Sequence, residues 1–173
     1  MDASQITDAG RELPLLLRLV ALTKDYPGLR ALDNVDFDLR AGECHVLFGE
    51  NGSGKSTLIS MVAGVQSPTS GKIIHQGKEV CLHSVQEARR MGISTVFQEF
   101  SLVPQLSVAD NIFLGAEISR SGMLRKSEQY EEARALISRF DFALDVGAPV
   151  GSLSRAEQQM VEIAKAFREP PQF

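Results

Sequence analysis

The order of apolar and polar residues divides the chain into two parts. Between residues 13 and about 98 the pattern predicts short strands alternating with short helices, and from about 99 to 168 it predicts helices alone. Val35, Phe37 and Leu39 alternate with charged residues, which is typical of a strand with one buried face. We therefore expect an α/β region followed by a helical region.

Four further apolar runs in the first part predict strands. Residues 15–23 are rich in Leu and Val, and residues 72–75 follow a Pro-Thr-Ser-Gly turn. Residues 44–48 and 93–98 are more continuously apolar, as expected of strands buried inside a sheet. Both of these strands would therefore lie in the interior of the α/β region.

Helix starts are marked by serine residues with an acidic residue three positions later, which is the pattern of an N-terminal capping box. Three such pairs occur, and they predict helices that begin at Ser84 with Glu87, Ser107 with Asp110, and Ser154 with Glu157. Two more helices are expected, one over residues 56–63 and one that follows Ser127 and runs to about Phe140.

The composition indicates a soluble protein of one domain. The chain has 173 residues, 43% of them hydrophobic and 23% charged, and a net charge of −4. That charge argues against nucleic acid as a partner, because nucleic-acid binding usually needs a basic face. The polar lead of residues 1–12 is unlike a secretory signal, and no apolar run could cross a bilayer, so we expect a cytoplasmic location.

The two cysteines predict no metal or redox chemistry. Cys44 and Cys81 lie 37 positions apart in apolar surroundings, which fits no metal-binding or redox spacing. We expect both to be buried free thiols in a reducing compartment.

A glycine-rich segment between a predicted strand and a predicted helix carries the strongest chemical signal. Its residues, which match the pattern G-x-x-x-x-G-K-[ST] of a phosphate-binding P-loop, are Gly49, Glu50, Asn51, Gly52, Ser53, Gly54, Lys55, Ser56 and Thr57. Glycines let the backbone turn its N–H groups inward, and the helix adds the positive end of its dipole. Lys55 would bind the β- and γ-phosphates, and the Ser56 hydroxyl would bind Mg²⁺. This segment predicts a nucleotide site.

Two later segments narrow the class of nucleotide-binding protein. Residues 96–112 run from Val-Phe-Gln-Glu to Asp-Asn-Ile, and residues 153–166 begin Leu-Ser-Arg-Ala-Glu-Gln-Gln. Together with the P-loop they resemble the ATP-binding cassette (ABC) ATPases, and most closely those of bacterial importers of the ribose, galactose and xylose class. The resemblance covers residues 15–168. It implies a P-loop NTPase core with an antiparallel β edge and an inserted helical subdomain.

The resemblance also implies roles for matching residues. Gln98 would be a catalytic ligand of Mg²⁺ or its water, beside Lys55, and Tyr26 would stack on adenine. The signature would be formed by Ser154, Arg155, Ala156 and Glu157, and would meet the ATP held by a second cassette paired head to tail. Because family members carry two glycines and a glutamine at the last three of these positions, we expect a weakened signature and slow hydrolysis.

The resemblance further predicts how the chain is organised. Residues 1–12 would be a flexible lead, 13–98 the nucleotide-binding core, 99–168 the helical subdomain, and 169–173 the start of a further strand. The family's Asp-Glu strand and switch histidine cannot be placed, so we expect a C-terminally incomplete cassette. Because losing a general base costs about 10²–10⁴-fold in rate, this chain alone should hydrolyse ATP barely or not at all.

The sequence thus predicts the ATP-hydrolysing subunit of a carbohydrate importer, located on the inner face of the cell membrane. It would act with membrane permease subunits and, indirectly, a sugar-binding protein. Three alternatives remain: an ABC ATPase for another solute such as amino acids, a soluble ABC ATPase that serves no transporter, and an inactive remnant.

Overall fold

The computed structural model describes residues 13–97 and 100–173. They form two compact units, one reaching to Ile93 together with Gln172–Phe173, and the other spanning Ser94–Pro171. The lead predicted over residues 1–12 lies outside the described residues.

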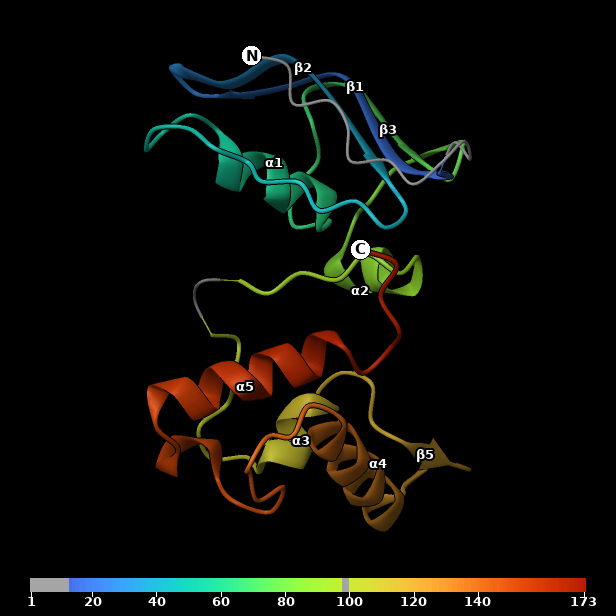
Figure 1. The fold of residues 1–173 in the computed structure, drawn as a ribbon, viewed down its shortest axis with the longest axis vertical. Helices are drawn as coiled ribbons and strands as arrows, with labels where there is room; N and C mark the ends of the chain where they lie inside the picture. The colour runs from blue at the N-terminus through green and yellow to red at the C-terminus, as the bar shows by residue number, and fades with distance from the viewer. Residues whose placement is uncertain (1–12, 98–99) are drawn as a thin grey trace. The chain divides into compact units, whose positions relative to one another are not determined.

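The first unit is built on a four-stranded antiparallel sheet. Its strands are β1 (Leu15–Tyr26), β2 (Leu29–Arg40), β3 (Ser70–His75) and β4 (Lys78–Val80), in the spatial order β2-β1-β3-β4. Leu19 of β1 pairs with Phe37 on one side and with Ile73 on the other. The strands predicted over 15–23, 35–39 and 72–75 are confirmed, and they form the sheet seen in Figure 1.

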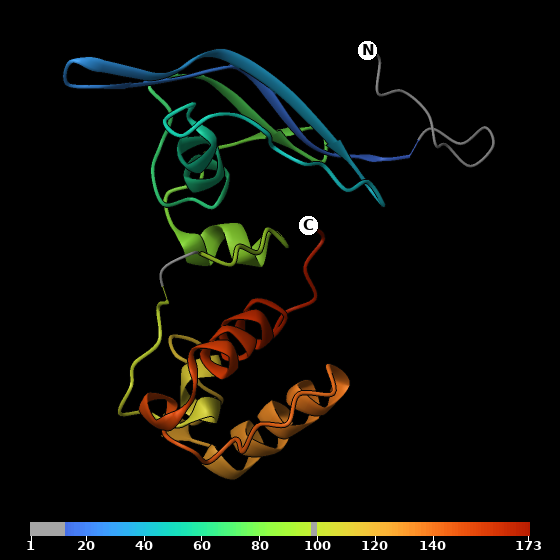
Figure 2. The same ribbon diagram turned by 60° about the vertical axis from the view of Figure 1, so that its left-hand side comes forward.

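One helix covers one face of this sheet. Helix α1 (Lys55–Val62) buries Leu58 and Met61 against leucines of β1, and Figure 2 shows it beneath the sheet. Helix α2 (Val85–Arg90) adds Ala88 to the same core. Burial of these apolar side chains is the main force that holds α1 and the loop before it on the sheet.

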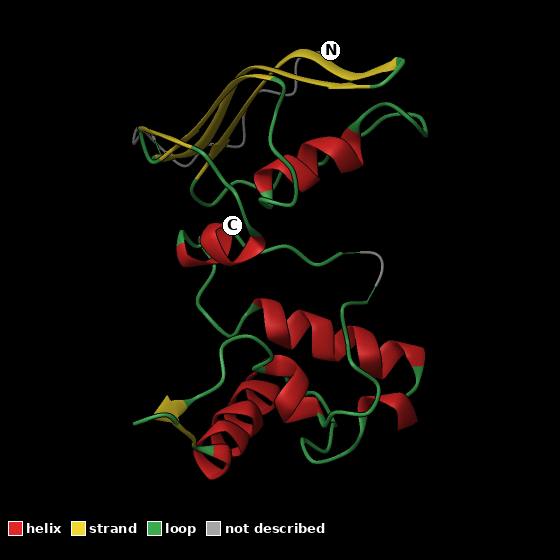
Figure 3. Ribbon diagram, turned by 180° about the vertical axis from the view of Figure 1, so that it is seen from behind, coloured by secondary structure: helices red, strands yellow, loops and turns green. Residues whose placement is uncertain are grey.

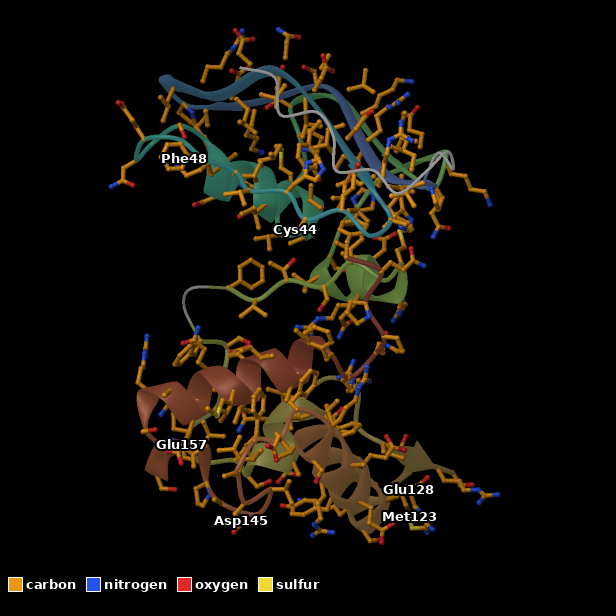
Figure 4. All side chains as sticks on the ribbon, in the orientation of Figure 1. Cys44, Phe48, Met123, Glu128, Asp145 and Glu157 are labelled. Carbon is orange, nitrogen blue, oxygen red and sulfur yellow. The ribbon has the colours of Figure 1, made fainter. Side chains whose placement is uncertain are left out.

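The prediction of a strand over residues 44–48 is wrong. This segment is a loop (Figure 3), and Figure 4 marks its ends at Cys44 and Phe48. Val46 is 83% exposed and Phe48 is 99% exposed. A strand needs neighbours for its backbone hydrogen bonds, and none of the described strands pairs with this segment. The buried location expected for Cys44 and Cys81 is also wrong, because both are free but exposed.

The prediction of a strand over residues 93–98 is also wrong for residues 93–97, which the structure describes. Ile93 is buried, but residues 93–97 join no sheet and Val96 is 43% exposed. A run of apolar residues indicates that a segment tends to be buried. Whether the segment forms a strand depends in addition on a neighbouring strand with which its backbone can pair.

The second unit consists mainly of helices, with a two-stranded sheet of β5 (Ser119–Arg120) and β6 (Met123–Leu124). Its helices are α3 (Val108–Ile112), α4 (Lys126–Arg139), the 3₁₀ turn η1 (Val150–Ser152) and α5 (Arg155–Ala166). The core is made of apolar side chains from all of these helices, including Ile112, Ala133, Val150 and Val161.

The predicted helix starts are confirmed by their caps. The hydroxyls of Ser84, Ser107 and Ser154 each accept a hydrogen bond from the backbone N–H three residues on. Helix α4 begins at Lys126 and has no side-chain cap, so Ser127, which was predicted to precede this helix, lies inside it. Every described helix is too short or too polar to span a membrane.

Candidate functional site

The glycine-rich loop ends at the first residue of α1, and Gly54 fixes that junction. Gly54 is the residue that caps α1, with φ of 86°, a left-handed conformation that L side chains rarely adopt. A Cβ placed on it would lie 2.5 Å from the carbonyl oxygen of Ala31 and 2.6 Å from Cδ2 of Leu32. The loop can therefore approach β2 this closely only because residue 54 has no side chain.

The ammonium group of Lys55 lies inside the loop that precedes it. Its Nζ atom donates hydrogen bonds to the carbonyl oxygens of Gly49 and Glu50, each at 2.7 Å, and to Oγ of Ser53 at 3.1 Å. A lysine ammonium has three donors, so these contacts use all of its capacity. The positive charge is thus held in the middle of the curved backbone, at the end of α1 where the helix dipole is also positive.

The other residues of the motif lie in the same loop and the first turn of α1. Gly49 is exposed, and a Cβ there would meet side chains of the same loop, with Oγ of Ser53 at 2.7 Å and Nζ of Lys55 at 3.7 Å. Asn51, Gly52 and Ser56 are exposed and Thr57 is half-buried. All nine residues of the predicted cradle thus lie in this loop and the first turn of α1, and their binding of phosphate stays a prediction.

Tyr26 lies on the hairpin that packs against this loop. Its hydroxyl donates a hydrogen bond of 2.6 Å to Oε1 of Gln66, and Nζ of Lys24 lies 5.4 Å from its ring centroid. Tyr26 pairs with Leu29 across the β1–β2 hairpin, and β2 continues to Ala31, which touches Gly54. Among the described residues no hydrogen bond or ring contact joins Tyr26 to the loop itself, and its stacking on adenine stays a prediction.

The proposed signature residues occupy the start of α5, where Figure 4 labels Glu157. The N–H of Glu157 donates to Oγ of Ser154, and the N–H of Ser154 donates to Oε2 of Glu157 at 2.7 Å. Hydrogen bonding from Ser154, through its side chain and then its backbone, lowers the pKa of Glu157. The carboxylate is therefore turned back into the cap rather than out toward a ligand.

The remaining signature residues are exposed. The guanidinium carbon of Arg155 lies 4.0 Å from the ring centroid of Phe100, in a cation–π contact, and Ala156 is open to solvent. Gln98, which was predicted to be a catalytic and metal-binding residue, lies outside the described residues. In the part of the chain that the structure does describe, no group of three or more His, Cys, Asp or Glu side chains could hold a metal ion.

One group of polar residues in the second unit was missed by the sequence analysis. Ser101 forms hydrogen bonds with Glu162 and Lys165 of α5, and both of these charged residues are buried. The available signal was a Glu and a Lys three positions apart within an otherwise apolar stretch of helix.

Comparison with known proteins finds ATP-binding proteins of sugar transporters among the relatives of this chain. The ribose import ATP-binding protein RbsA 2 of Streptomyces coelicolor is 50% identical over 152 residues, covering 88% of this chain and 29% of that protein. The galactofuranose transporter ATP-binding protein YtfR of Escherichia coli K12 is 45% identical over 161 residues, covering 93% of this chain and 32% of its own length. The chain thus spans about a third of the length of these relatives.

Solved structures of ABC transporter cassettes share the fold of this chain. A nucleotide-free ATP-binding cassette from an ABC transporter superimposes with a TM-score of 0.78 and 25% identity, over 91% of this chain and 66% of that one. The dimeric bacterial ABC transporter cassette MJ0796 gives a TM-score of 0.73 and 27% identity, over 90% and 71%. The family model described as "ABC transporter" matches residues 32–173, and the chain therefore belongs to the ABC transporter family.

Proposed function

We propose that this chain forms the ATP-binding part of a subunit that powers sugar import. The observation that carries the proposal is the ammonium of Lys55, held by two carbonyl oxygens and a hydroxyl inside a glycine loop at the start of α1. Phosphate oxygens would replace these neutral oxygens as acceptors, so that both donor and acceptor would be charged, and they would also lie at the positive end of the helix dipole.

The residues near Lys55 would share the work of holding the nucleotide. Ser56, exposed in the first turn of α1, offers a hydroxyl oxygen of the kind that Mg²⁺ accepts. Bound Mg²⁺ would neutralise charge on the β- and γ-phosphates, with Gln98 as a second ligand to the metal or its water. Tyr26 would contribute a ring for the adenine, since 38% of its surface is exposed.

Catalysis would need a second cassette. The start of α5, with its N-terminal dipole and the positive charge of Arg155, offers an anion-binding surface to an ATP molecule bound by a partner. Because Glu157 is turned back into the cap, its carboxylate would oppose phosphate less than its position in the sequence suggests. The dimeric form of the similar cassette MJ0796 supports such a pairing.

Sugar is the favoured cargo because the relatives named above are import or transport subunits for ribose and galactofuranose. The complete protein would then act at the inner face of the cell membrane, with permease subunits and, through them, a sugar-binding protein. ATP binding would close the cassette pair and hydrolysis would reopen it.

The test is the ATPase activity of the full-length protein, reconstituted with its permease and binding protein. Ribose or a galactose sugar should raise ATP turnover, whereas amino acids should not. Stimulation by an amino acid alone would indicate a transporter of another solute. An ATP turnover rate that is the same with and without the permease, together with binding of the protein to ribosomes, would indicate a soluble ABC ATPase.

A further inference from the structure

Two charged residues are buried in α5 where an apolar helix face would be expected. Glu162 and Lys165 are each only 6% exposed. Charged side chains are almost never buried this far unless they have partners, because removing them from water is costly. Their partners therefore indicate what these residues do.

Both side chains reach Ser101, which lies in the segment that follows Gln98. The backbone N–H of Ser101 donates to Oε1 of Glu162 at 2.5 Å, and its hydroxyl donates to the same oxygen at 3.0 Å. Nζ of Lys165 donates to the Ser101 hydroxyl oxygen at 3.1 Å. A hydroxyl has one proton and can accept as well, so all three bonds can form together. We call Ser101, Glu162 and Lys165 the Ser101 network.

A second contact fixes the neighbouring residue to the same helix. The guanidinium carbon of Arg155 lies 4.0 Å from the ring centroid of Phe100. Residues 155 and 162 are about two helical turns apart, so they lie on one side of α5. Residues 100 and 101 are thus attached to α5 at two separated points, one of them in the signature.

We propose that Glu162 and Lys165 are positioning residues, which hold the segment after Gln98 on the helix that carries the signature. The signature and residues 100 and 101 would then move as one piece during the ATPase cycle, and this role rests on the proposed function. Stability alone explains the network poorly, because well-packed apolar residues often replace a buried charged group at no loss of stability.

The first test measures amide hydrogen exchange at Ser101 in this chain. Glu162→Ala removes the acceptor of two hydrogen bonds and should speed exchange of the Ser101 amide by about tenfold or more. Glu131→Ala, which truncates an exposed glutamate of α4, is the matched control and should change nothing there. If the Ser101 amide exchanged at the wild-type rate in Glu162→Ala, the proposal that Glu162 holds Ser101 would be overturned.

The second test measures ATP turnover by the full-length protein. Glu162→Ala should lower kcat roughly tenfold with KM for ATP unchanged, because the P-loop belongs to the other unit, and Glu162→Gln, which keeps an acceptor oxygen, should recover part of the rate. Equal kcat for wild type and Glu162→Ala would overturn the positioning role alone. A wild-type protein that hydrolyses no ATP would instead overturn the proposed function.

A third variant covers the case in which Glu162→Ala does not fold. The double variant Glu162→Met with Lys165→Met removes both buried charges and fills the space with apolar atoms. It should fold with wild-type stability and still show faster exchange at Ser101 and a lower kcat. Wild-type exchange and kcat in this variant would overturn the proposal.

Discussion

Replacing Gly54 by alanine should destabilise the first unit by an amount that can be worked out from two features. The added Cβ would lie 2.5 Å from the carbonyl oxygen of Ala31 and 2.6 Å from Leu32, so backbone must move. Such overpacking costs about 1–3 kcal/mol. The φ of 86° costs an alanine a further ~1–2 kcal/mol.

Gly77→Ala is the matched control for this prediction. Gly77 has a φ of 78°, but a Cβ placed there would meet nothing within 4 Å. The two variants share the conformational cost and differ in the clash. For a chain of this size, Gly54→Ala should melt about 2–12 °C below Gly77→Ala by circular dichroism. Equal melting temperatures would refute the close packing of the P-loop against β2.

Three further predictions concern other parts of the chain. Asn111, fully buried, accepts from the N–H of Val103 and donates to three carbonyl oxygens, so Asn111→Ala should lower the unfolding free energy in urea by about 3–4 kcal/mol. Phe48→Ser should change that free energy by less than about 0.5 kcal/mol, because Phe48 is 99% exposed, yet should reduce aggregation measured by light scattering. The cap that lowers the pKa of Glu157 should stabilise α5 fully above the ordinary glutamate pKa of about 4.3, and lose that effect as pH falls through the lowered pKa. Glu157→Gln should abolish this part of the pH dependence in hydrogen exchange of the first turn.

Local features of the fold could be predicted from the sequence because their causes are local. The capping serine at 154 and the glutamate three residues on bond to each other whatever the rest of the chain does. The P-loop is similar, since its glycines, lysine and following helix are contiguous. Alternation of apolar and charged residues likewise located the strand over 35–39.

Features that depend on distant partners could not be predicted in this way. The segment 44–48 has the composition of a buried strand, but no described strand pairs with it, and its side chains are exposed. The burial of Glu162 and Lys165 depends on Ser101, which is more than 60 positions away in the sequence. The pattern along the chain indicates which structure or burial a residue favours. Whether the residue adopts it depends on contacts with residues that are distant in the sequence.

The most direct test of the nucleotide site is calorimetric titration of this chain with MgATP. Wild type should bind, and Lys55→Ala should weaken binding by roughly 10–100-fold, the worth of a hydrogen bond to a charged group. Lys78→Ala, which removes an exposed lysine of β4, should bind as wild type does. Equal affinity of wild type and Lys55→Ala, or no binding by wild type, would contradict the account.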